Sequence, residues 1–286
     1  MPDFPIVDAH VHLYDPSVIP YGWMRGKPVL DRPRLMAQLD DERGECEIDA
    51  LVWIEVAVDP GQYLQEAAYV DGLARADPRI RALVAHAPLE RGAPVTPDLE
   101  KLAAHERVHG IRRLVQDEAD VAFCLRPGFI EGVRLLSSFD LSFGIGVYHR
   151  QLASAVELVR RCPDVRFVLD HCGKPGIRDK LMEPWRTHIT ALANLPNVWC
   201  KISGLITEAD PQGWTREQLR PYIDHTIERF GFGRVMFGSD WPVSEQTHRY
   251  GEWVDVVDWA VAEVSDNERR RLFRENAIAF YRLDAA

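Results

Sequence analysis

The 286-residue sequence lacks the cysteine pattern of a disulfide-stabilised protein. Its five cysteines are scattered along the chain without paired spacing, and their number is odd. They are Cys46, Cys124, Cys162, Cys172 and Cys200. A disulfide framework is therefore not expected, and the reducing cytoplasm is the compartment that fits this cysteine usage best.

Long hydrophobic runs are also missing. Nowhere do about 18 apolar residues follow one another, which is the length that a membrane-spanning helix needs. The N-terminal stretch MPDFPIVDAHVH has neither the basic start nor the long apolar segment of a signal peptide. We therefore expect neither membrane insertion nor secretion.

The sequence has no long run of basic residues, and its formal net charge is -10. Because binding to a phosphate backbone depends on clustered lysine and arginine, a nucleic-acid partner is not expected. The composition, 46% hydrophobic and 27% charged, is typical of a globular protein with a sizeable core. A small molecule is the expected ligand, and the sequence leaves homo-oligomerisation open.

Eight short apolar and β-branched runs alternate with segments whose apolar residues recur at helical spacing. The runs begin at Ile6, Leu51, Ile80, Gly110, Leu141, Arg166, Val198 and Arg234. Strands that are apolar almost throughout are typical of a sheet covered by helices. Eight such strand–helix units predict a (β/α)₈ barrel, an α/β fold that forms one domain over residues 1–286.

An open, doubly wound sheet is the alternative fold. Such a sheet usually carries a glycine-rich turn after its first strand, where this chain has the residues DAHVH at positions 8–12 instead. The next segment, residues 13–30, is a long connection with several prolines and glycines. Connections of this length inside a domain are usually functional. We predict that this segment lies over the mouth of the pocket.

Four polar side chains end three of the expected strands, at the edge where barrel enzymes place their active sites. His10 and His12 are two residues apart in an extended strand, so both rings face the same side. His171 ends the sixth strand and Asp240 the eighth. Two histidines alone are more often packing or surface residues, but four convergent groups are not explained by independent packing roles. A carboxylate beside a metal or imidazoles stays ionised and can accept a proton from water.

The motifs DAHVH, LDHCGKP and MFGSDWPV, in this order, resemble the amidohydrolase superfamily over nearly the whole chain. They are most similar to its sugar-acid lactonase branch, which is related to 2-pyrone-4,6-dicarboxylate lactonase. The resemblance implies hydrolysis of a small sugar lactone. It also implies one divalent metal, expected to be zinc, with His10, His12 and Asp240 as ligands. Asp240 would activate water, and His171 would join it as a catalytic residue.

The fourth strand departs from the two-metal pattern of the superfamily. Many members have a bridging lysine or glutamate there, whereas this chain has Arg112 and Arg113. One metal or none is therefore expected, as in similar members of the lactonase branch. Without a metal, Arg112 and the histidines would have to stabilise the oxyanion. Neighbouring strand residues face opposite sides, so only one arginine enters the barrel, and we favour Arg112.

Five further residues are candidates with an ordinary structural alternative. Glu55, at the end of the second strand, is a candidate metal ligand or an ion-paired carboxylate. His149 is a candidate substrate contact or a helix cap. Trp23 and Trp241 are candidate walls of a sugar site or core residues. Lys174 would contact a substrate oxygen or form a salt bridge.

Three other functions remain as alternatives. The same scaffold and metal ligands also serve decarboxylation of aromatic or unsaturated acids. Hydrolysis of amides, imides or phosphoesters is a second alternative, although it usually needs a more heavily metallated site. A non-catalytic binding barrel is a third, and it predicts ligand binding without turnover.

Overall fold

The computed structural model describes residues 1–283, and these residues contain one sheet of eight parallel strands in sequence order. The strands are β1 (Ile6–Val11), β2 (Ile48–Ile54), β3 (Ile80–Ala85), β4 (Val108–Arg112), β5 (Ser142–Ile145), β6 (Phe167–Leu169), β7 (Val198–Ile202) and β8 (Val235–Phe237). Each of the eight expected strands is present. The (β/α)₈ barrel predicted from the sequence is thus confirmed.

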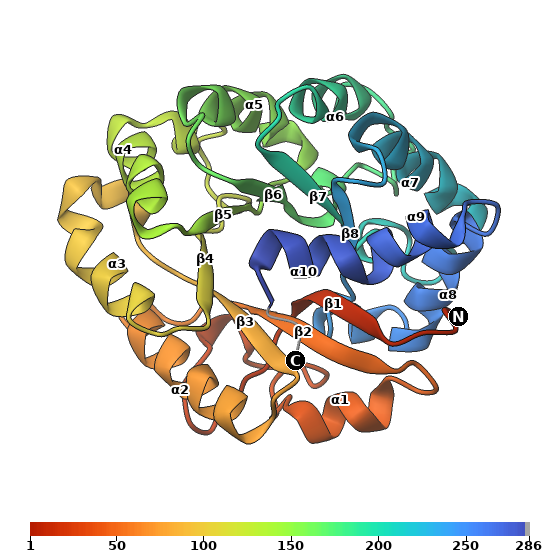
Figure 1. Cartoon of the computed structure of the whole chain (residues 1–286), viewed down its shortest axis with the longest axis horizontal. Helices are drawn as coiled ribbons and strands as arrows, with labels where there is room; N and C mark the ends of the chain where they lie inside the picture. Colours follow the sequence, from red (N-terminus) through yellow and green to blue (C-terminus); the bar gives the residue numbers. More distant parts are fainter. Residues whose placement is uncertain (284–286) are drawn as a thin grey trace.

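Helices follow the strands around the outside of the sheet (Figure 1). They are α1 (Met36–Glu42), α2 (Tyr63–Ala76), α3 (Thr96–Ala103), α4 (Pro127–Leu135), α5 (Leu152–Arg161), α6 (Trp185–Ala193), α7 (Arg216–Phe230), α8 (Tyr250–Ala260), α9 (Asp266–Arg270) and α10 (Asn276–Tyr281). Figure 1 shows α10 lying across the strands rather than beside them. Its Phe280 and Tyr281 pack with small and β-branched side chains of the strands, such as Ala9 and Val52. Helix α10 therefore completes the apolar core inside the barrel.

The barrel closes where the end of β1 meets the segment that follows β8. The amide of Asp240 donates to the carbonyl oxygen of His10 over 2.9 Å. The amide of His12 donates to the carbonyl oxygen of Trp241 over 2.8 Å. The two hydrogen bonds that join the first and last units of the barrel therefore also fix three of the four candidate catalytic residues beside one another.

The segment at residues 13–30 leaves the barrel edge and returns to it. Its base is tied by two backbone hydrogen bonds between Tyr14 and Arg34, of 2.9 and 2.8 Å. The Tyr14 hydroxyl also donates to the carbonyl oxygen of Leu30 over 3.0 Å. Trp23 and Lys27 of this segment line the cavity described below.

All five cysteines are buried and unpaired. None of the helices in residues 1–283 is both long enough and apolar enough to cross a membrane.

Gly132 of α4 packs closely against the backbone of Leu89, in the segment that follows β3. A Cβ atom at this position would lie 2.1 Å from the carbonyl oxygen of Leu89, a backbone atom that cannot rotate away. We predict that Gly132→Ala lowers the free energy of unfolding by about 1–3 kcal/mol, as overpacking does elsewhere. Guanidinium unfolding followed by circular dichroism measures the change.

Gly72 provides the matched control because it also lies inside a helix, α2, but a Cβ atom there would meet nothing within 4 Å. Gly72→Ala should leave stability unchanged or raise it by up to about 1 kcal/mol. Equal effects of the two substitutions would contradict the close packing of α4.

Candidate active site

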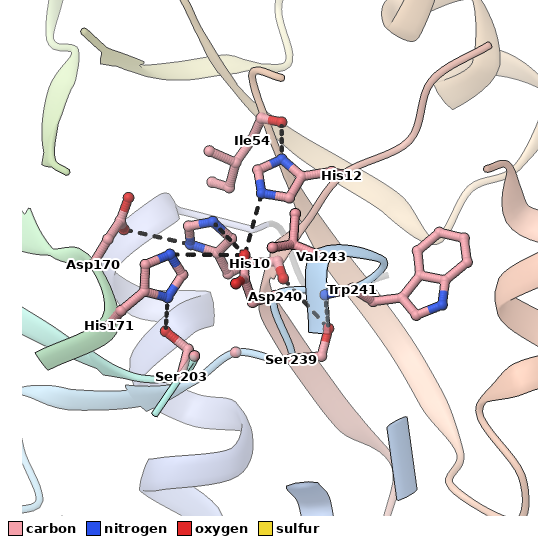
Figure 2. Close-up of polar contacts among 12 residues, drawn as sticks. His10, His12, Ile54, Asp170, His171, Ser203, Ser239, Asp240, Trp241 and Val243 are labelled. Atoms are coloured by element: carbon pink, nitrogen blue, oxygen red, sulfur yellow. Dashed lines mark hydrogen bonds and ion pairs between the residues drawn. The ribbon is translucent and has the colours of Figure 1, made fainter. Parts of the chain in front are cut away.

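Three imidazoles surround one carboxylate oxygen at the carboxyl edge of the barrel (Figure 2). The Oδ1 atom of Asp240 lies 3.3 Å from Nε2 of His12, 3.6 Å from Nε2 of His10 and 3.7 Å from Nε2 of His171. All four side chains are buried. The structure therefore brings together the four residues that the sequence placed at three strand ends.

Hydrogen bonds on the far side of two rings set their orientation. Nδ1 of His12 lies 2.9 Å from the carbonyl oxygen of Ile54. Because a carbonyl only accepts, this Nδ1 carries a proton, and Nε2 is the ring nitrogen that faces Asp240. Nδ1 of His171 lies 2.9 Å from the hydroxyl of Ser203, which turns its Nε2 toward the same carboxylate.

The backbone at two of these residues is strained. His171 has a φ of 53° and Asp240 a φ of 61°, which is the left-handed region that side chains with a Cβ disfavour. Such a conformation costs about 1–2 kcal/mol per residue. Strain of this kind persists where the surroundings over-determine it, and it clusters at functional sites. It aims both side chains at the barrel axis here.

The charge states follow from burial and from the neighbouring groups. Burial lowers the pKa of His171 to about 4, and it lowers the pKa of His10 well below its usual range. Both rings are therefore neutral at pH 7. Burial opposes ionisation of Asp240, but the surrounding imidazoles hold its pKa below the ordinary value. An ionised carboxylate beside neutral imidazoles makes this centre attractive to a cation.

The donor atoms fit a divalent metal. Ligand atoms of His10, His12 and Asp240 all lie within 4.8 Å of one another. In a tetrahedral site with bonds of about 2.0–2.1 Å, ligand atoms are about 3.3 Å apart, close to the separations of 3.3 and 3.6 Å between Asp240 and the two imidazoles. Imidazole nitrogen and carboxylate oxygen are also the donors that zinc accepts.

Arg112 enters the barrel and Arg113 does not. The Nε atom of Arg112 donates to Oε1 of Glu55 over 2.7 Å, and its Nη1 lies 3.3 Å from Nε2 of His10. Arg113 instead pairs with Glu90 and Glu118 outside the barrel. Arg112 therefore places a buried cation next to the candidate metal ligands.

Glu55 does not join the metal ligands. Its Oε1 accepts from Arg112, and its Oε2 accepts from the amide of Ala57 over 2.7 Å. Neither group of metal-ligating atoms within residues 1–283 includes it. The placement corrects the metal assignment made from the sequence and matches its alternative, an ion-paired carboxylate.

A cavity of about 490 Å³ opens above the centre. It is lined by His12, Trp23, Lys27, Val56, Ala57, Arg112, Leu114, Gln116, Asp117, Gly146, His171, Lys174, Asp240 and Val243. The lining comes from several different strand–helix loops. Its size suits a small organic molecule.

Two residues expected at the substrate lie elsewhere. The indole of Trp241 points away from the cluster, and its Nε1 donates to Glu42 over 2.8 Å (Figure 2). The Nδ1 atom of His149 lies 3.0 Å from the carbonyl oxygen of Lys174. Neither side chain is among the cavity-lining residues of the described chain. Trp241 is a core residue, and His149 fixes the loop that carries Lys174.

Sequence reasoning missed two charged residues beneath the histidines. Lys201 on β7 is 1% exposed, and its Nζ lies 3.0 Å from Oδ1 of Asp170. Asp170 also lies 3.5 Å from Nδ1 of His10. A lysine in the middle of the apolar run VWCKIS was the available signal, because such a residue is buried only when paired.

The Amidohydrolase family profile matches residues 7–283 of the chain. The chain belongs to the amidohydrolase family. It is 33% identical to an L-fucono-1,5-lactonase of Burkholderia multivorans, with 97% of this chain and 96% of that protein covered. It is 23% identical to an L-rhamnono-gamma-lactonase of Scheffersomyces stipitis, with 99% of this chain and the whole of that protein covered.

Among solved structures, the fold is similar to that of an amidohydrolase from Burkholderia multivorans with bound zinc. The TM-score is 0.86 at 30% identity, and the match covers 98% of this chain and all of that chain. Membership of the family and the group of His10, His12 and Asp240 together support a divalent metal at this centre.

A second buried carboxylate lies behind Glu55. Oε1 of Glu66 on α2 accepts from the amide of Val56 over 3.1 Å. Burial and the nearby Glu55 raise the pKa of Glu66 to about 8. Glu66 is therefore protonated in the folded protein at pH 7, although an unfolded chain would ionise it.

We predict that Glu66→Gln stabilises the protein increasingly as the pH rises from about 5 to 8. The folded pKa of about 8 lies above the ordinary 4.5, so the native protein loses stability over this interval while Gln has no proton to lose. The difference between the two proteins should grow by up to about 1.4 kcal/mol per pH unit. Denaturant unfolding at several pH values measures it. The exposed Glu100→Gln is the control, and a flat difference for Glu66→Gln would contradict the protonated state.

Proposed function

We propose that this amidohydrolase is a lactonase that opens the cyclic ester of a small sugar acid, of the L-fucono-, L-galactono- or L-rhamnono-lactone type. The observation that carries the proposal is the cluster of three imidazoles around Asp240 at the floor of a small-molecule cavity. The names of the lactonase relatives support the substrate class. A lactone needs only water and proton transfer, which these groups can provide.

The reaction begins with Asp240 accepting a proton from water at the cavity floor. The water oxygen bonds to the lactone carbonyl carbon, and the carbonyl oxygen takes up the negative charge. Collapse of this tetrahedral species breaks the bond to the ring oxygen. Asp240 or His171 then returns the proton to that oxygen, and a hydroxy acid is released.

A divalent metal, proposed to be zinc, would be held by His10, His12 and Asp240, and it would lower the pKa of water and polarise the carbonyl. Arg112 is the residue of this chain that can assist the oxyanion. Its guanidinium lines the cavity and stays charged at all relevant pH values. Glu55 holds Arg112 in position from behind, through the 2.7 Å contact described above.

Trp23 and Lys174 are the proposed substrate contacts. The indole Nε1 of Trp23 donates to the carbonyl oxygen of Val56 over 2.9 Å, which anchors the ring at the cavity wall. A fixed indole face can pack against the C–H surface of a sugar. Lys174, on the loop after β6, provides donors for ring hydroxyl or carboxylate oxygens.

The test is a pH-indicator assay of acid release across five- and six-membered aldonolactones, before and after chelation. Hydrolysis of one stereochemical series is the expected result. Loss of activity on chelation and its return with Zn²⁺ would support the metal, whereas full activity of the metal-free protein would assign the oxyanion to Arg112. No turnover on any lactone, together with release of carbon dioxide from an unsaturated acid, would overturn the proposal.

Asp240→Asn should lower kcat by about 10²–10⁴-fold, which is the usual contribution of a general base. The amide keeps the shape of the side chain, so the fold should persist in circular dichroism. Asp179→Asn is the control because Asp179 lies on the exposed surface. Ordinary activity of Asp240→Asn on the hydrolysed lactone would remove Asp240 from the reaction.

A further inference from the structure

The barrel interior contains two overlapping groups of metal-ligating atoms, and they share His10. One group is His10, His12 and Asp240, and the other is His10, Asp170 and His171. His12 and Asp240 line the cavity, while Asp170 is not among its lining residues in the described chain. The geometry of the ligands alone would therefore allow a second ion behind the first.

Lys201 occupies the second group. Its Nζ lies 3.0 Å from Oδ1 of Asp170 and 3.3 Å from Nδ1 of His10, which are two of the atoms that a second ion would need. Lys201 and Asp170 are each 1% exposed. A lysine ammonium donates hydrogen bonds and has no lone pair to share, so its position excludes a metal ion from the same space.

Arg112 holds the other oxygen of the same carboxylate. Its Nη1 lies 3.3 Å from Oδ2 of Asp170, while its Nε pairs with Glu55. The result is a buried row of alternating charges, Glu55, Arg112, Asp170 and Lys201. Both carboxylates in this row are already neutralised by a cation, and a second divalent ion at Asp170 would lie beside two fixed positive charges.

We propose that Lys201, supported by Arg112, takes the place of a second metal ion and limits this centre to one divalent cation. Both carboxylate oxygens of Asp170 already form ion pairs with Lys201 and Arg112, so Asp170 is not available to a second metal ion. Asp240 lies outside the row of ion pairs and keeps its negative charge for the single ion at His10 and His12. The inference rests on the metal centre of the proposed function but not on the lactone substrate.

The burial of the ion pair between Lys201 and Asp170 favours a role in limiting metal binding over a purely structural role. An apolar pair of similar size would fit the barrel interior at least as well, because removing two charges from water offsets much of their attraction. Lys201 lies among apolar interior residues, with its Nζ 5.6 Å from the centre of the Tyr281 ring. A fixed positive charge at this depth is better explained by the chemistry of the neighbouring histidines.

The test counts metal ions per chain by mass spectrometry of the protein after equilibration with excess Zn²⁺ and gel filtration. Wild type should hold one ion. Lys201→Met removes the ammonium and frees Oδ1 of Asp170, so this variant should hold close to two ions. Its melting temperature should rise more with added Zn²⁺ than that of wild type. With Co²⁺ as the probe, visible absorption per chain should increase in parallel.

Three variants control this experiment. Lys201→Arg keeps the positive charge and should remain at one ion. The double variant Lys201→Met with Asp170→Asn removes the freed ligand together with the cation, so it should also remain at one ion and should fold. Lys201→Gln removes the positive charge but keeps a polar side chain in the interior, so it should bind two ions even if Lys201→Met does not fold.

Wild type with two ions, wild type with none, or one ion in both Lys201→Gln and Lys201→Met would overturn the inference. The number of bound metal ions per chain can be measured whether or not the protein hydrolyses a lactone. A protein that holds one ion but hydrolyses no lactone would therefore keep the inference and reject the proposed substrate.

Discussion

The pairing between the end of β1 and the segment after β8 is the constraint on which the site depends. Two backbone hydrogen bonds close the barrel there, between Asp240 and His10 and between His12 and Trp241. The carboxylate of Asp8 reinforces them, since its Oδ1 accepts from the amides of His10 and Ser239 over 3.1 and 2.9 Å. Because closure and catalytic geometry depend on the same residues, His10 and His12 cannot separate from Asp240 without opening the barrel.

The interior beneath this closure is held together by charge balance. Arg112 and Lys201 offset Glu55 and Asp170, whereas Asp240 lies outside this row and is surrounded by imidazoles. Unpaired charges of this kind would be costly in a dry interior, but a row of close ion pairs reduces the cost. The carboxylate of Asp240 therefore lies at the cavity floor, where it can bind a cation or accept a proton.

The strands could be predicted from the spacing of apolar residues along the chain. The four site residues could be predicted because each is a polar residue at the end of one of these strands. Strand order then brings His10, His12, His171 and Asp240 to one edge. Contacts that depend on side-chain direction were not predictable in the same way. Trp241 follows Asp240 directly, yet the pairing that directs Asp240 inward turns the indole toward Glu42. For Glu55 the sequence left two roles open, a metal ligand or an ion-paired carboxylate, and only the contact with Arg112 from another strand decides between them.

The loops provide cavity-lining residues that the strand ends do not. Trp23, Gln116 and Lys174 reach the cavity from three separate loops, while the histidines and Asp240 belong to the strand ends that close the barrel. Substitutions in those loops can change which hydroxyl groups are recognised without moving the catalytic atoms. His149 shows how such a loop is fixed, since its contact with the carbonyl of Lys174 positions the lysine from outside the cavity. The residues that line the cavity wall and the residues that form the catalytic centre therefore come from separate parts of this protein.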